Sequence, residues 1–128
     1  MSLLFPSSTL VTDRVIGAAI RVHRALGPGL LESAYHACLA HELTLEGHLV
    51  EVEVEVPVVY KGIQVKSGFR ADLIIDSTVL VEVKAVAKLI PIHDAQVLTY
   101  LNLTGIKAGL LMNFNVPVLK DGLRRLLL

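Results

Sequence analysis

Three residues of this chain are best suited to chemistry: the acids Asp72 and Glu82, and the amine of Lys84. They lie in two neighbouring segments, 68–75 and 79–85, that are rich in β-branched and apolar residues. Such segments, separated by the polar triplet Asp-Ser-Thr, predict two strands of a β-hairpin. The hairpin therefore carries the candidate chemistry.

The length of the loop, residues 76–78, fixes how the two strands pair. With a three-residue loop Ile75 faces Val79, so Asp72 lies directly opposite Glu82. Like charges in that position destabilise a strand pair by a few tenths to about 1 kcal/mol. Two facing carboxylates become favourable when a divalent cation binds between them. One face of this hairpin is wholly apolar: Ala71, Leu73, Ile75, Val79, Val81, Val83 and Ala85.

The same register permits a purely structural alternative. Arg70 falls opposite Lys84, so two like-charged pairs sit side by side on the charged face. In a surface lattice of charges, the diagonal pairs Arg70–Glu82 and Asp72–Lys84 would offset the repulsion. Diagonal neighbours are ~7–8 Å apart, which makes such ion pairs weak.

The length and composition predict one domain over residues 1–128, in which residues 1–10 form a loosely ordered N-terminal segment. No run of eighteen residues lacks charge, so a membrane-spanning helix is not expected. The single cysteine, Cys38, reads as core filler and suits a reducing, cytoplasmic setting. Twelve basic and twelve acidic residues balance, which argues against bulk, non-specific nucleic-acid binding but leaves room for a local basic cleft.

Periodicity predicts the remaining elements. Thr12 is the expected N-cap of the first helix, and Gly27-Pro28-Gly29 is expected to end it. The expected helices are 11–26, 30–46 and 92–104, and the other expected strands are 49–56, 58–60, 63–66 and 107–113. The tail, 116–128, reads as a short helical turn followed by an edge strand. These elements predict a mixed α/β (α+β) domain, with a mixed sheet of four to six strands flanked by helices.

Two of the predicted helices supply further polar candidates. Glu32 lies close to the N-terminus of the second helix and shares a face with Tyr35, although an acid in a first turn also serves simply to stabilise the helix dipole. Gln96 and Tyr100, four residues apart in the third helix, form a small donor platform. The simpler alternative is a core tyrosine beside a solvated glutamine. The five histidines read as structural or surface residues, with His93 the one that could border the site.

The segment Gly29-Leu30-Leu31-Glu32-Ser33-Ala34-Tyr35 resembles the motif that names the GxxExxY family of small prokaryotic proteins. The resemblance runs from about Thr12 to the C-terminus. The further matching segments are Gly17-Ala18-Ala19-Ile20, Val22-His23, Tyr60-Lys61-Gly62, His93-Asp94-Ala95-Gln96 and Asn113-Phe114-Asn115-Val116. That family is similar to the PD-(D/E)XK nuclease-like superfamily, whose core resembles that of restriction endonucleases.

This resemblance implies a role for each candidate. Asp72 would be the motif aspartate, and Glu82 with Lys84 the E-x-K pair. Gln96 and Tyr100 would form the Q-x-x-x-Y helix of the recombination-exonuclease branch and contact the substrate. The chain departs from the founding motif only in having alanine where that motif has proline, just before the aspartate.

The implied cofactor is Mg²⁺ or Mn²⁺. Its ligands would be Asp72, Glu82, the Val83 carbonyl and, directly or through water, Glu32. Bound there, the ion would acidify a water and neutralise charge on the scissile phosphate, while Lys84 would orient or deprotonate that water or stabilise the phosphorane.

The implied activity is phosphodiester hydrolysis, with DNA preferred to RNA as the partner. Arg70, a substrate-binding residue in this scheme, together with Lys66 and Lys88 would contact the phosphate backbone. The alternative is a non-catalytic ligand- or protein-binding module that retains the nuclease fold. The neutral charge and the absence of an obvious basic arm favour the module, whereas the intact D…E-x-K with Q-x-x-x-Y favours the enzyme. The apolar tail and the alternating valines of 49–56 also favour a homodimer.

Overall fold

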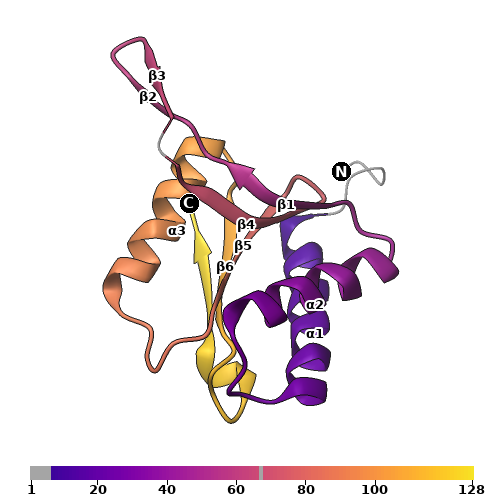
Figure 1. Ribbon diagram of the computed structural model, residues 1–128. Coiled ribbons are helices and arrows are strands. Elements are labelled where there is room, and N and C mark those ends of the chain that lie inside the picture. Colours follow the sequence, from indigo (N-terminus) through magenta and orange to yellow (C-terminus); the bar gives the residue numbers. More distant parts are fainter. Residues whose placement is uncertain (1–6, 67) are drawn as a thin grey trace.

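A computed structural model describes residues 7–66 and 68–128 of the chain. Its centre is a five-stranded mixed sheet in the order β1-β4-β5-β6-β7, and a separate two-stranded ribbon, β2-β3, stands away from it (Figure 1). The helices are α1 (Ser8–Leu26), α2 (Glu32–Leu45), α3 (Pro91–Thr104) and the 3₁₀ turn η1 (Leu119–Gly122). The strands are β1 (Val50–Glu55), β2 (Val58–Tyr60), β3 (Ile63–Val65), β4 (Arg70–Ile75), β5 (Val79–Lys84), β6 (Ala108–Asn113) and β7 (Leu123–Leu127). The mixed sheet with flanking helices confirms the predicted fold class.

Among the strands of the described residues, β5 and β6 alone pair in parallel, and α3 forms the crossover between them. The other neighbours in the sheet pair antiparallel. In sheets of this kind, ligands commonly bind beyond the carboxyl ends of the parallel strands. Glu82 and Lys84 lie at that end of β5, and Asn113 lies at the corresponding end of β6.

Helices cover both faces of the sheet (Figure 1). On one face α1 and α2 pack on an apolar core whose centre includes Val15, Leu39, Leu73, Val81 and Leu110. On the other face α3 packs on a second core that includes Ile74, Leu80, Val97, Leu101 and Leu111. Most of the central hairpin is therefore buried on both faces. On the face that carries the charges Glu82 is buried, Asp72 and Lys84 are partly buried, and Arg70 is exposed.

The first helix begins earlier than its periodicity predicts. Ser7 is the N-cap, and its hydroxyl accepts a hydrogen bond from the N–H of Leu10 at 3.2 Å. Thr12, the predicted cap, is a buried interior residue whose hydroxyl donates to the carbonyl of Thr9. The predicted loose lead is thus wrong for residues 8–10, which are helical, and residues 1–6 lie outside the described part of the chain.

The central hairpin pairs in the predicted register. Leu73 pairs with Val81 and Ile75 with Val79, on either side of the three-residue loop. The loop end is tied to the start of β1 by Asp76, whose carboxylate accepts from the N–H of Leu49 at 2.9 Å and lies 2.6 Å from Nδ1 of His48. The N–H of Asp76 in turn donates to the carbonyl of Leu49. The loop end of the hairpin is therefore firmly held.

The edge strand β1 departs from the strict alternation predicted for it. Glu53 has a φ of 50°, in the left-handed region, at the position opposite Asp72. As a result Val50 packs against the core under α1 and α2, whereas Val54 packs against the core under α3. The predicted single apolar face of this strand is wrong, and Val52 is half exposed. Ala71, expected on the face of Leu73, likewise joins the core under α3.

Cys38 is exposed on α2, so its predicted place in the core is wrong. It lies off the stripe of Tyr35, Leu39 and Leu43, which is the buried face of that helix. The C-terminal edge strand after a helical turn is confirmed by η1 and β7. No helix in the described ranges is long and apolar enough to cross a bilayer.

Candidate active site

The two acids of the hairpin meet where its backbone pairing ends. Beyond the Leu73–Val81 pair, the N–H of Asp72 donates to Oε1 of Glu82 at 3.0 Å. The N–H of Val83 donates to Oδ2 of Asp72 at 2.8 Å. Carboxylate oxygens therefore take the place that backbone carbonyls have in the rest of the ladder. These two bonds hold the side chains against the strands, and a hydrogen bond between the two carboxyl groups also contributes to the pKa of Glu82.

Glu82 is a buried acid, with 3% of its surface exposed. Burial, and next the negative charge of Asp72, raise the pKa of Glu82 to about 8. The hydrogen bond from the backbone of Asp72 and the charge of Lys84 act in the opposite direction, but they are the smaller effects. Without a cation, Glu82 is thus protonated at neutral pH, which removes the repulsion expected between the two acids.

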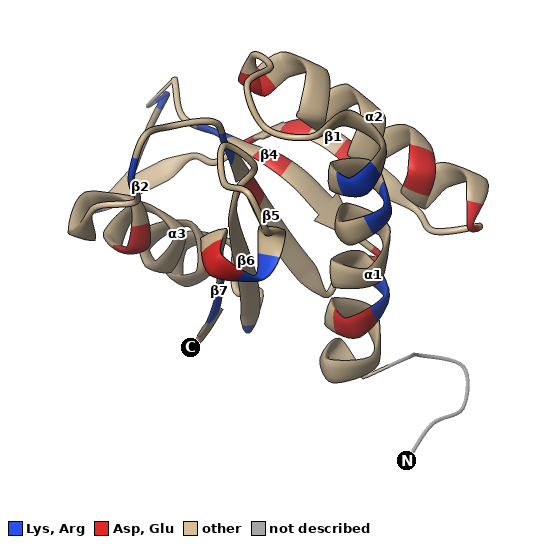
Figure 2. Cartoon of the chain, turned by 90° about the horizontal axis from the view of Figure 1, so that it is seen from below, with Lys and Arg blue, Asp and Glu red and all other residues tan. Residues whose placement is uncertain are grey.

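The structure does not form the alternative lattice of surface charges. Arg70 lies 3.6 Å from a carboxylate oxygen of Glu53 on β1, and both side chains are well exposed. Among the described residues, neither of the diagonal ion pairs, Arg70–Glu82 or Asp72–Lys84, is formed. The burial of Glu82 is also inconsistent with a solvated lattice. In Figure 2 the acidic positions of β1, β4 and β5 lie across neighbouring strands of the sheet.

Lys84 is linked to the predicted pair on α3. Its Nζ donates to Oε1 of Gln96 at 3.4 Å, and Nε2 of Gln96 donates to the hydroxyl of Tyr100 at 3.0 Å. Tyr100 is buried, and this burial, with a further contribution from the charge of Glu82, raises the pKa of its hydroxyl. Lys84, Gln96 and Tyr100 thus form one hydrogen-bonded chain. Tyr100 belongs to the apolar core, as the simpler alternative has it, and Gln96 is partly buried.

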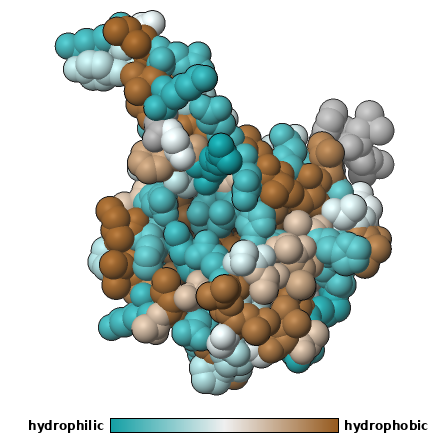
Figure 3. All heavy atoms as spheres, viewed as in Figure 1, coloured by the Kyte–Doolittle hydropathy of each residue, from teal (hydrophilic) through white to brown (hydrophobic). Residues whose placement is uncertain are grey.

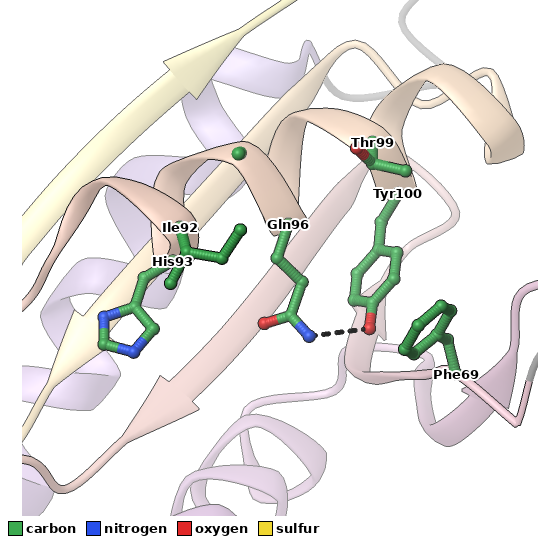
Figure 4. A pocket seen from close by; sticks show the side chains of 7 residues that line it. Phe69, Ile92, His93, Gln96, Thr99 and Tyr100 are labelled. Atoms are coloured by element: carbon green, nitrogen blue, oxygen red, sulfur yellow. Dashed lines mark hydrogen bonds between the residues drawn. The ribbon is translucent and has the colours of Figure 1, made fainter.

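The same helix face lines a pocket of about 490 Å³. Figure 4 shows Gln96 and Tyr100 side by side on α3, with the ring of Phe69 next to the tyrosine hydroxyl and His93 on the preceding turn. The full lining is Phe69, Ile92, His93, Ala95, Gln96, Thr99 and Tyr100. His93 therefore lines the same pocket as Gln96 and Tyr100, although the sequence favoured a structural or surface role for it.

Glu32 is the first residue of α2 and is largely exposed. Partial burial raises the pKa of its carboxyl group; the charge of Lys84 opposes this rise, and that of Asp72 adds to it. These interactions show that Glu32 lies on the same side of the molecule as the hairpin acids. Within residues 7–66 and 68–128, however, no three acidic, histidine or cysteine side chains are grouped closely enough to hold an ion. Glu32 is thus a neighbour of the acid pair, at longer range.

Tyr35 explains how Glu32 is positioned. Its hydroxyl donates to the carbonyl of Gly27 at 2.6 Å and accepts from the N–H of Leu30 at 3.0 Å. Its ring stacks on Phe114 with 4.7 Å between centroids. Gly29, with a φ of 101°, supplies the turn that only glycine adopts readily. The motif residues of this segment therefore brace the α1–α2 connection from which Glu32 projects.

Two site neighbours were missed from the sequence. Nε2 of His36 lies 3.1 Å from the carbonyl of Asp72, and His36 also influences the pKa of Glu32. Asn113 is buried, and its amide both donates to the carbonyl and accepts from the N–H of Val86, just beyond Lys84. The helical spacing of His36 from Glu32 and the place of Asn113 at a strand end were the available signals.

The acid pair fits a hard divalent cation. Carboxylate oxygens are the ligands that Mg²⁺ and Mn²⁺ prefer. A cation can take the place of the proton that a buried carboxyl group holds at neutral pH. Asp72 and Glu82 would hold such an ion. The ion would supply positive charge at a bound phosphate and a more acidic water.

The family model that matches this chain describes the PD-(D/E)XK nuclease superfamily and covers residues 9–126. The chain belongs to that superfamily, whose nucleases generally depend on divalent metal ions. No curated protein and no solved structure matches the chain. The membership agrees with the mixed sheet and with an acid pair and lysine on its central hairpin.

Proposed function

We propose that the protein is a metal-dependent nuclease that hydrolyses phosphodiester bonds, in DNA rather than RNA. The observation that carries this proposal is the meeting of Asp72 with the buried Glu82 beside the oriented amine of Lys84. Membership of the nuclease superfamily supports it.

The roles follow from the positions of the side chains. Asp72 and Glu82 would hold Mg²⁺ or Mn²⁺, and the carbonyl of Val83, the residue whose N–H donates to Asp72, is a further ligand in the proposal. Lys84, aimed by Gln96, would orient the attacking water and stabilise charge on the phosphate. Tyr100 would keep Gln96 in place, and Glu32 would act at longer range through water.

The test is cleavage of linear, circular, nicked and branched DNA in Mn²⁺ by the wild-type protein, Asp72→Asn and Lys84→Ala. We expect both variants to reduce cleavage to background. Glu51→Gln is the matched control, because Glu51 is an exposed acid on the neighbouring strand β1, and it should cleave like the wild type. Equal cleavage by all four proteins would identify a contaminant and reject the proposed activity.

One observation favours the non-catalytic module instead. The described residues assemble two acidic side chains, and no third acid, histidine or cysteine joins them at ligand distance. A binding module would bind Mn²⁺ in calorimetry and cleave no substrate. Binding that survives Asp72→Asn would place the ion elsewhere in the molecule and contradict both functions as assigned here.

A further inference from the structure

The ribbon formed by β2 and β3 is an arm that leaves the sheet between β1 and β4 (Figure 1). Its backbone pairs from Val58–Val65 to Tyr60–Ile63, closed by the turn at Lys61 and Gly62. The side chains of Tyr60 and Ile63 are 61% and 65% exposed. Figure 3 shows the arm as a projection on which apolar and hydrophilic residues alternate. No described residue of β2 or β3 belongs to either apolar core, so the arm is not part of the packing that stabilises the domain.

The arm is a locally basic part of the sequence. Between Glu55 and Asp72 the chain has no acidic residue and three basic ones, Lys61, Lys66 and Arg70, although the whole chain is neutral. Arg70 at the base is close to Glu53. Within the described ranges, Lys61 and Lys66 form no ion pair. Both ammonium groups are therefore open to an anionic partner.

The arm and its base also carry exposed aromatic rings. Tyr60 is 61% exposed and Phe69 is 52% exposed, whereas the tyrosines and phenylalanine of the two cores, Tyr35, Tyr100 and Phe114, are buried. The amine of Lys61 lies 5.4 Å from the centroid of the Tyr60 ring, so cation and aromatic surface are adjacent at the tip. Aromatic faces next to cations are the groups that bind unpaired bases and their phosphates.

The chain that leaves the arm runs directly into the candidate active site. The ring of Phe69 is 6.1 Å from that of Tyr100 and lines the same pocket as Gln96. Arg70 is the first residue of β4, two positions before Asp72. An extended ligand that lies along the arm would therefore reach the acid pair.

We propose that this arm is a binding track for single-stranded nucleic acid, with Tyr60 stacking on a base and Lys61 and Lys66 contacting phosphates. The inference rests on the proposed nuclease function and assigns its substrate class. A second copy of the chain is the less favoured occupant, because a two-fold interface places a patch against itself, and this patch would bring like charges together.

The test measures binding of fluorescein-labelled oligothymidine and oligouridine to the full chain in EDTA, by anisotropy. We expect Tyr60→Ala to weaken binding at least about fivefold. Lys61→Ala combined with Lys66→Ala should also make the dependence of log affinity on log salt shallower by about 1.4. The matched control is Lys107→Ala combined with Lys120→Ala, two exposed lysines away from the arm, which should leave affinity nearly unchanged.

Hydrolysis of bis(p-nitrophenyl) phosphate in Mn²⁺ separates this inference from the nuclease function. Tyr60→Ala should keep that hydrolysis, because the small substrate does not reach the tip of the arm, whereas Asp72→Asn should lose it and still bind the oligonucleotides. Arm-dependent binding without any hydrolysis would support the track and reject the nuclease. The track is rejected if the arm variants bind like the wild type, if duplex DNA is the only ligand affected, or if the variants merely dissociate a dimer in sedimentation.

Discussion

The surroundings of the Glu82 carboxyl group determine its protonation and therefore the chemistry that it can perform. It is buried, it accepts the N–H of Asp72, and its pKa lies near 8 because burial and a neighbouring acid both favour the proton. A proton thus occupies the position in which the proposed function places a cation. Two predictions follow, one for stability and one for ion binding.

The first is a pH dependence of stability. Between the unfolded pKa near 4.5 and the folded pKa near 8, the folded state holds a proton that the unfolded state has lost. The free energy of unfolding therefore falls as pH rises through this window, by on the order of a few kcal/mol, and is constant above it. Glu82→Gln removes this titration, so its melting temperature relative to wild type should rise from about pH 5 to pH 8. A difference independent of pH would contradict the raised pKa.

The second concerns the cation. Because the ion and the proton compete for Glu82, Mn²⁺ should bind more tightly at pH 8 than at pH 6 and release protons on binding. Calorimetry in two buffers of different ionisation enthalpy measures that release directly. Glu82→Gln should bind Mn²⁺ weakly and release no proton. Glu51→Gln, the exposed control on β1, should behave like the wild type.

At the scale of elements, the turn between α1 and α2 sets the position of Glu32. Tyr35→Phe keeps the stacking on Phe114 and removes both hydrogen bonds of the hydroxyl. We expect a loss of about 1–3 kcal/mol in the free energy of unfolding. Chemical denaturation measures it, and nuclease activity should fall at temperatures where the variant is still folded. Tyr60→Phe is the control, because that tyrosine is exposed on the arm, and its stability should not change.

The elements also show where sequence reasoning succeeds. Strand periodicity and a three-residue turn depend on neighbours in the chain, so the register that brings Asp72 opposite Glu82 was predictable. The burial of Glu82 was not, because α3, which covers that face, comes later in the chain and its packing leaves no local signal. His36 was missed for the same reason: its partner, the carbonyl of Asp72, is distant in sequence. Cys38 was misplaced because its apolar character outweighed its position off the buried stripe.

At the scale of the whole molecule, the charges balance, with twelve of each sign. Nucleic-acid binding should then depend on the arm and not on a general field. We expect a slope of log affinity against log salt no steeper than about −2, one contact for each of the three basic residues from Lys61 to Arg70. Titrations of the wild type at several salt concentrations measure the slope. A slope near −6 would mean that other basic surfaces take part.

The homodimer suggested by the sequence stays a prediction. The structure leaves β1 and β7 as the two edges of the sheet, and Leu127 on β7 is 68% exposed. Pairing of two β7 edges would place these leucines together. Sedimentation should then show a dimer that Leu127→Lys converts to a monomer, and a monomeric wild type would reject the pairing.

The central hairpin is held very differently at its two ends. At the loop, Asp76 exchanges two hydrogen bonds with Leu49, just before β1. At the other end, among the described residues, Asp72 is joined to Glu82 and Val83 through carboxyl side chains. The loop end of the hairpin is thus fixed, whereas the opposite end is held less firmly. Amide hydrogen exchange should be slow for Ile75 and Val79 and faster for Asp72 and Val83. An ion bound between Asp72 and Glu82 should slow exchange at Asp72 and Val83 alone, so that the two ends of the hairpin exchange at similar rates.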